Sequence, residues 1–299
     1  MYLFHLSRST LPATMFFLFR LLNWLPLPLL HNLGALVGWL NWLLSPSYRR
    51  LLRENLAQAG LSGYRNDAIA AAGQMMFELP KIWLRPQAEV MERVASVSGQ
   101  EHVDAAWTAG KGILYLTPHL GCFEITAQYL ASHRPITVLY RAPKQVWLQA
   151  LYEAGRAANL KIAAADMSGV RALLKALRSG EAIGMLPDQV PGNGEGVWAP
   201  FFGRPAYSMT LAARMADTGA SVLLTYAERL PYGAGYHVHF LPLSAPLAGT
   251  TEEKVAQLNG EIERVIRECP GQYLWGYNRY KRPSGAPRPP VTTDGAERT

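Results

Sequence analysis

The chain has 299 residues, of which 49% are hydrophobic, so it is long enough for one large domain or two small ones around an ample core. Only 17% of the residues are charged, below the usual quarter, which predicts that part of the chain lies in or on an apolar phase. The net charge of +7 favours an anionic partner. Because the basic residues form no long arm and are not interleaved with aromatic residues, we expect a lipid surface and no nucleic acid. The two cysteines, Cys122 and Cys269, match neither a disulfide framework nor a metal-ligand spacing.

Residues 1–48 carry most of the hydrophobic excess and are predicted to be a membrane anchor. From residue 21 to Tyr48 there is no Asp, Glu, Lys or Arg, and this stretch is longer than the roughly 20 residues that span a bilayer. Pro26 and Pro28 interrupt it. Two geometries remain open: one spanning helix over about residues 27–45, or a helical hairpin whose two arms lie in the membrane interface. A buried core helix is a third alternative, but soluble helices seldom run so far without a charge.

A basic cluster, Arg49, Arg50 and Arg53, follows directly after this anchor. Basic residues beside an apolar segment mark the cytoplasmic side of a membrane and can contact anionic headgroups. We therefore expect an anionic bilayer surface as a partner, with the bulk of the protein on the cytoplasmic face.

Strand and helix patterns alternate from Val94 onward, which predicts an α/β fold with a sheet flanked by helices. The expected strands cover residues 113–116, 136–140, 162–165, 182–186, 222–227 and 236–241, and the expected helices cover residues 123–131, 144–158, 170–178, 210–218 and 251–268. Residues 49–282 are thus predicted to form a single domain. The tail, residues 283–299, is rich in Pro, Gly, Ser and Thr and is expected to be disordered.

His119 and Glu124 flank a predicted strand-to-helix turn that contains Gly121. At a spacing of five they would lie on different faces of one continuous helix, so a productive pair needs His119 in the turn and Glu124 in the first helical turn. There the carboxylate could accept from one imidazole nitrogen and leave the other free as a base. The carboxyl end of a strand is also where open α/β sheets place their ligands. On local chemistry alone, a capping or solvated histidine is the more common outcome.

Further polar residues lie near other predicted strand ends or helices. Arg141 follows the strand ITVLY, whereas Arg156 and Arg171 lie on or at the start of helices and could simply be solvated. Asp188 and Gln189 follow the strand AIGML and precede a glycine-rich loop, and long loops in compact domains tend to carry function. A turn or helix-cap carboxylate is an equally good interpretation of Asp188.

His237 and His239 alternate on one face of a predicted strand. Two imidazoles on one strand face make a metal site conceivable. Because no third ligand is evident nearby in the sequence, we predict no metal site.

Several blocks together resemble one family, the bacterial lipid A late acyltransferases of the lysophospholipid acyltransferase superfamily. The family's His-x4-Asp/Glu hallmark is matched by His119 and Glu124, and the resemblance continues to about residue 283. The other matching blocks are YRRLLRENL, VLYRAPK, AGRAANL, GVRALLKALRSGEAIGMLPDQ, WAPFFGRPA and PGQYLWGYNRYKRP. The resemblance implies a glycerolipid acyltransferase-like fold with a mixed sheet and an N-terminal anchoring helix.

The resemblance also implies the chemistry. A catalytic pair of His119 and Glu124 would transfer an acyl chain directly from a thioester to a hydroxyl of a lipid A precursor, a membrane lipid acceptor, with no cofactor and no metal. The donor would be acyl-ACP (acyl carrier protein) or acyl-CoA, and a basic surface would suit the acidic carrier protein. Substrate contacts are expected from three arginines, Arg141, Arg156 and Arg171, and from Asp188 and Gln189, which follow a predicted strand. The location would be the bacterial inner membrane, with the catalytic domain on its cytoplasmic face.

The sequence departs from the family pattern at three places, and these departures leave the acceptor open. Cys122 and Phe123 replace the more usual Asn-Trp, Gly276 to Asn278 replaces a block with His and Arg, and Val190 stands where a second Asp is common. The acceptor could instead be an amino-acid lipid, a polyene or a lysophospholipid. A non-catalytic membrane protein that binds a lipid or a carrier protein is the alternative from another class.

Overall fold

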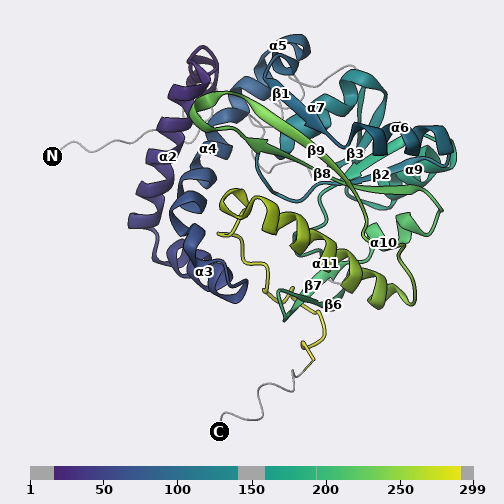
Figure 1. The fold of residues 1–299 in the computed structure, drawn as a ribbon. Helices are drawn as coiled ribbons and strands as arrows, with labels where there is room; N and C mark the ends of the chain where they lie inside the picture. The colour runs from purple at the N-terminus through teal and green to yellow at the C-terminus, as the bar shows by residue number, and fades with distance from the viewer. Residues whose placement is uncertain (1–16, 141–158, 193, 291–299) are drawn as a thin grey trace, which may run out of the picture.

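The computed structural model describes residues 17–140, 159–192 and 194–290. Its centre is a seven-stranded sheet with the order β1-β9-β8-β2-β5-β3-β4 (Figure 1). The strands are β1 Val94–Ser98, β2 Ile113–Leu116, β3 Ile136–Tyr140, β4 Leu160–Ala164, β5 Ala182–Met185, β8 Ser221–Arg229 and β9 Tyr236–Pro242. Neighbouring strands are parallel except for the antiparallel pair β8 and β9. The predicted mixed α/β fold is confirmed.

Helices cover both faces of this sheet (Figure 1). They are α2 Leu27–Leu44, α3 Pro46–Gln58, α4 Arg65–Leu84, α5 Gln87–Met91, α6 Gln100–Ala109, α7 Phe123–His133, α9 Met167–Arg178, α10 Leu211–Ala216 and α11 Thr251–Glu268. Side chains of α9, α10 and α11 pack into the core on one face, and those of α5, α6 and α7 pack on the other. The central strands β2 and β5 are buried at every position, as expected for parallel strands covered on both sides.

Some parts of the chain differ from the sequence-based expectation. The glycine-rich segment after Gln189 contains a hairpin of β6 Gly196–Phe201 and β7 Arg204–Met209 in addition to loop. Residues 283–290 contain no helix or strand, but Ala286 is buried and the Trp198 indole N–H donates to the Pro287 carbonyl at 3.0 Å. This part of the expected disordered tail therefore packs on β6. The expected helix over residues 144–158 lies outside the described residues.

The apolar N-terminal segment forms a single continuous helix after Pro26. Helix α2 is, within the described residues, the one helix long and apolar enough to cross a membrane, and 33% of it is buried. It packs closely along α4. The two helix backbones are so near each other that a Cβ atom at Gly73 of α4 would collide with the Gly34 carbonyl of α2. Its other side is exposed and apolar; this exposed apolar face comprises Leu29, Leu36, Val37, Trp39, Leu40, Leu43 and Leu44.

A buried ion pair joins α4 to the sheet. Both oxygens of the Glu78 carboxylate accept hydrogen bonds from the Arg229 guanidinium of β8, at 2.8 and 2.6 Å, and the Tyr236 hydroxyl of β9 donates to the same carboxylate at 3.1 Å. The His31 ring of α2 lies 3.4 Å away. Burial opposes ionisation of Glu78, but Arg229 and the hydrogen bonds outweigh it and lower its pKa to about 2.

This pair generates a stability prediction. Glu78→Ala leaves the Arg229 guanidinium buried without a counter-ion, and we expect it to lower the free energy of unfolding by about 3–5 kcal/mol. Thermal unfolding of the detergent-solubilised protein measures the change. The matched control is Glu54→Ala, which removes the exposed carboxylate paired with Arg50 at 3.9 Å and should change little. If the two variants unfold alike, the buried pair does not stabilise the fold.

Candidate active site

The residues around His119 form a tight turn between β2 and α7. The Thr117 N–H still pairs with the Met185 carbonyl of β5 at 3.0 Å, and after Pro118 the chain leaves the sheet. Gly121 has a φ of +60°, and a Cβ atom there would collide with the Ala227 carbonyl of β8. Glycine is therefore required for this turn, which ends where α7 begins at Phe123.

His119 is held by Asp188 from the neighbouring strand end. The ring Nδ1 lies 2.8 Å from Asp188 Oδ1, and the His119 backbone N–H donates to Asp188 Oδ2 at 3.0 Å. The two residues meet because β2 and β5 are adjacent and parallel, so that their carboxyl ends open at the same edge. A proton on Nδ1 shared with the carboxylate leaves Nε2 with a lone pair, as a general base requires.

This geometry corrects the predicted partner of His119. The Glu124 carboxylate does lie in the first turn of α7, but it accepts a hydrogen bond from the Trp83 indole N–H of α4 at 3.2 Å. The carboxylate that contacts the His119 ring is Asp188, which the sequence predicts as a substrate contact or a turn residue. The spacing of five residues could not reveal this, because the orienting residue comes from another strand. The predicted catalytic role of Glu124 stays a prediction.

The two carboxylates have opposite pKa shifts. Asp188 is 2% exposed; burial opposes its ionisation, but the charge and hydrogen bonds of His119 outweigh burial and lower its pKa. For Glu124, burial dominates and raises the pKa, only partly offset by the Trp83 hydrogen bond and by His119. Asp188 is therefore the carboxylate suited to stabilise an imidazolium.

Two further residues contact the His119 ring. The Gln189 side-chain amide nitrogen lies 3.0 Å from Nε2, and the Phe123 ring centroid is 4.8 Å from that of the imidazole. Gln189 thus lies beside the predicted base, and its predicted substrate contact stays a prediction. A hydroxyl that approaches Nε2 must take the place of this amide.

The C-terminal segment supports the turn from the other side. The His119 carbonyl accepts from the Leu274 N–H at 3.1 Å, and the Gly121 N–H donates to the Gln272 carbonyl at 3.1 Å. Burial and the nearby Asp188 carboxylate raise the pKa of Tyr273 far above its usual value. These residues were not predicted individually, although the block PGQYLWGYNRYKRP that contains them was noted. Their contacts join segments about 150 positions apart along the chain, which no local pattern reveals.

The predicted arginines have different outcomes. Arg141 and Arg156 lie outside the described residues. Arg171 is on the exposed surface of α9, where its Nε–H donates to the Met167 carbonyl at 3.3 Å. Its predicted substrate contact stays a prediction.

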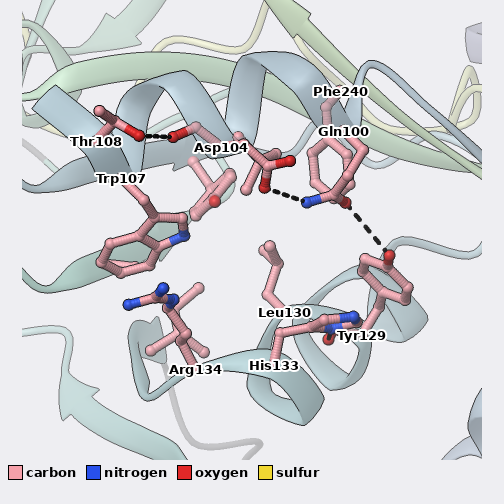
Figure 2. Close-up of a pocket in the computed structure, with 13 residues that line it drawn as sticks. Gln100, Asp104, Trp107, Thr108, Tyr129, Leu130, His133, Arg134 and Phe240 are labelled. Carbon is pink, nitrogen blue, oxygen red and sulfur yellow. Dashed lines mark hydrogen bonds between the residues drawn. The ribbon is translucent and has the colours of Figure 1, made fainter.

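Two cavities lie between α7 and the sheet, on the Glu124 side of the turn. The smaller, of about 80 Å³, is lined by Glu124, Phe123 and mainly apolar residues of β2, β3 and β5. The larger, of about 500 Å³, lies between α6 and α7 (Figure 2). Tyr115, Leu130 and Ile136 line both cavities, so they adjoin. Polar groups also line the larger one: Gln100 donates to Asp104 at 3.0 Å, and the Arg134 guanidinium lies over the Trp107 ring (Figure 2).

Comparison with known proteins identifies the family to which the chain belongs. The family model for bacterial lipid A biosynthesis acyltransferases matches residues 4–282. The lipid A biosynthesis lauroyltransferase of Escherichia coli is 26% identical over 276 residues, which cover 88% of this chain and 89% of the relative. The palmitoleoyltransferase of the same organism is also 26% identical, with 87% and 88% covered. A phosphatidylinositol mannoside acyltransferase of Mycobacterium tuberculosis is 26% identical over 55% of this chain and 53% of its own length.

The matched residues include the whole β2–α7 turn, the Asp188 strand end and the C-terminal segment that supports His119. The chain is therefore an acyltransferase that belongs to the bacterial lipid A biosynthesis acyltransferase family.

Proposed function

We propose that this protein is a membrane-associated O-acyltransferase that moves a fatty acyl chain from acyl-ACP to a hydroxyl of a lipid A precursor on the cytoplasmic face of the bacterial inner membrane. The observation that carries the proposal is the Asp188–His119 pair, with both Asp188 oxygens bonded to His119 and the other ring nitrogen, Nε2, beside the Gln189 amide. The family and the lipid A transferases among the relatives support the acceptor class.

The mechanism follows from this pair. His119 Nε2 removes the proton from the acceptor hydroxyl as its oxygen attacks the thioester carbonyl. The Asp188 carboxylate stabilises the imidazolium that forms. When the tetrahedral intermediate collapses, the new ester forms, the carbon–sulfur bond breaks, and the imidazolium can return its proton to the thiolate that leaves. The transfer is direct and requires no covalent acyl-enzyme. The amide N–H groups at the start of α7 beside His119 favour negative charge developing on the carbonyl oxygen.

We further propose that the acyl chain enters the two cavities beside Glu124. Their shared lining by Tyr115, Leu130 and Ile136 gives an apolar path that begins at the turn. A fatty chain needs more room than the smaller cavity offers, so these side chains would shift to join the two. The depth of the joined cavity would then limit chain length.

The exposed apolar face of α2 supports membrane association. The helix has 18 residues and a length of about 27 Å, close to the roughly 30 Å of a bilayer core. A spanning position would also draw the adjacent α4 into the bilayer, together with Asp67, Glu78 and Lys81. We therefore favour an interfacial position, with the exposed face in the acyl layer and the Arg49, Arg50 and Arg53 cluster of α3 near anionic headgroups.

The first prediction from this proposal concerns the reaction. In a bacterial host without its late lipid A acyltransferases, the wild-type chain should add one acyl mass to lipid A, and His119→Ala should lower that activity about 10²- to 10⁴-fold because the base is lost. Mass spectrometry of lipid extracts measures both.

Purified enzyme offered matched acyl-ACP and acyl-CoA donors then identifies the carrier. If another lipid gains the chain, the acceptor is different, and phosphatidylinositol mannoside-like glycolipids are the first to examine because of the mycobacterial relative. If no lipid changes with folded protein, the chain is a non-catalytic binding protein.

A second prediction separates the two carboxylates. Asp188→Asn should lower kcat by roughly 10²- to 10⁴-fold, because the amide cannot hold the imidazole in the reactive tautomer or stabilise its charged form. Glu124→Gln, which keeps an acceptor for the Trp83 indole, should lower kcat less. Steady-state kinetics of both variants, with thermal unfolding to show that each is folded, gives the comparison. A larger loss for Glu124→Gln would restore Glu124 as the orienting residue.

A third prediction concerns the membrane. Replacing Leu36, Leu40 and Leu43 together by Gln should weaken flotation with vesicles that contain anionic phosphatidylglycerol, because the variant buries less apolar area in the bilayer. Met167→Gln, an exposed apolar position on α9, is the control and should float as the wild type does. Alkaline carbonate should extract the wild-type protein from membranes. Resistance to carbonate would instead favour a spanning helix.

A further inference from the structure

Two histidines and a glutamate lie on one face of the β8–β9 pair, and none of them contacts His119 through a hydrogen bond given for the described residues. In the antiparallel pairing of β8 and β9, Glu228 lies opposite His237, and His239 lies two residues further along the same face. One ligand atom from each of the three side chains can be chosen so that all lie within 4.8 Å of one another. A nitrogen–nitrogen–oxygen set of this size surrounds a space that one small cation would fill.

The contacts of His239 leave a lone pair in that space. The Ser98 hydroxyl of β1 lies 2.9 Å from His239 Nδ1, and the ring stacks on Tyr226 with centroids 4.4 Å apart. An Nδ1–H that donates to Ser98 leaves Nε2 unprotonated. That Nε2 atom is buried and has no hydrogen-bond partner in the described structure. Metal-binding histidines usually donate a hydrogen bond from the ring nitrogen opposite the metal in this way.

The distance to Glu228 supports the same conclusion. His239 Nε2 and Glu228 Oε2 are 3.6 Å apart, which is too long for a good hydrogen bond. Two ligand atoms on a tetrahedral Zn²⁺ ion, each about 2.0 Å from the metal, are about 3.3 Å apart. The observed separation is thus near that of neighbouring ligands.

We propose that Glu228, His237 and His239 bind a divalent transition-metal ion, with Zn²⁺ as the best match to two imidazoles and one carboxylate. Water would complete the coordination. The sequence-based prediction set a metal aside because no third ligand was evident near the two histidines. The fold supplies that ligand from the neighbouring strand.

The position of the site indicates that the metal ion would have a structural role. Glu228 follows Ala227, whose carbonyl accepts from the Cys122 N–H at 2.8 Å and thereby holds the catalytic turn. A metal that joins β8 to β9 at this point would fix the strand end that supports the turn. It would act on stability and on the geometry of His119, without taking part in acyl transfer.

The test is metal binding by the full-length detergent-solubilised protein, freed of any affinity tag and stripped with chelator. Titration with ZnCl₂ in a calorimeter should show one equivalent bound by the wild type. Glu228→Gln, His237→Ala and His239→Ala should each weaken binding at least about tenfold, since each removes one of three ligands. His102→Ala, a change at a partly exposed histidine beside Glu101, is the matched control and should retain full affinity.

Thermal unfolding gives a second readout. Zn²⁺ should raise the unfolding temperature of the wild type and of His102→Ala but not of Glu228→Gln, a near-isosteric change at a partly exposed position that should leave the fold intact. The proposal is overturned if the wild type binds no Zn²⁺ in a saturable way. It is equally overturned if the three ligand variants bind it as tightly as the control does.

Discussion

The Glu78–Arg229 ion pair is the constraint on which the rest of the structure depends. It places an ionised carboxylate and a charged guanidinium in the interior. Each charge is tolerated there only because the other group is bonded to it in a bidentate arrangement. Glu78 comes from α4 and Arg229 from the end of β8, so the pair fixes the helical N-terminal layer against the sheet. Burial, together with the negative charge of Glu78, also raises the pKa of the adjacent Cys122 thiol at the start of α7. Cys122, one of the departures from the family pattern, is therefore a neutral packing residue beside the catalytic turn and not a nucleophile.

The same strand end connects this pair to the chemistry. Ala227, two residues before Arg229, accepts the Cys122 N–H, and Gly121 forms a bridge with it. The turn that carries His119 is thus held on one side by β8 and on the other by the segment around Gln272. A general base must be fixed in position before the substrate arrives, because its contribution depends on geometry within fractions of an ångström. On the proposed mechanism, the buried ion pair would support catalysis by maintaining that geometry, although it touches no residue of the proposed catalytic pair.

Local patterns in the sequence predicted most strands and helices, because buried parallel strands such as ILYL and AIGM are continuous apolar runs bounded by breakers. His119 was identified in the same way, from a strand end followed by a glycine turn. Its partner could not be identified by spacing, since Asp188 reaches it only through the adjacency of β2 and β5. Glu228 was missed beside His237 for the same reason: the register of β8 and β9 is a property of the fold. The β6–β7 hairpin was read as loop because its glycines and prolines conceal the alternation of a short two-stranded unit.

Helix α4 links the exposed apolar face of α2 to the active site as one rigid element. Gly73 contacts α2, Glu78 bonds to Arg229, and Trp83 bonds to Glu124, all within about 15 Å along a single helix. A face of α2 in contact with the membrane would therefore set the height of the His119 turn above the acyl layer, with no flexible tether between them. The acceptor hydroxyl of a lipid headgroup lies at a similarly fixed height above its own chains. A protein built in this way can select its acceptor by depth as well as by contacts, because only hydroxyls at the level of His119 Nε2 can replace the Gln189 amide.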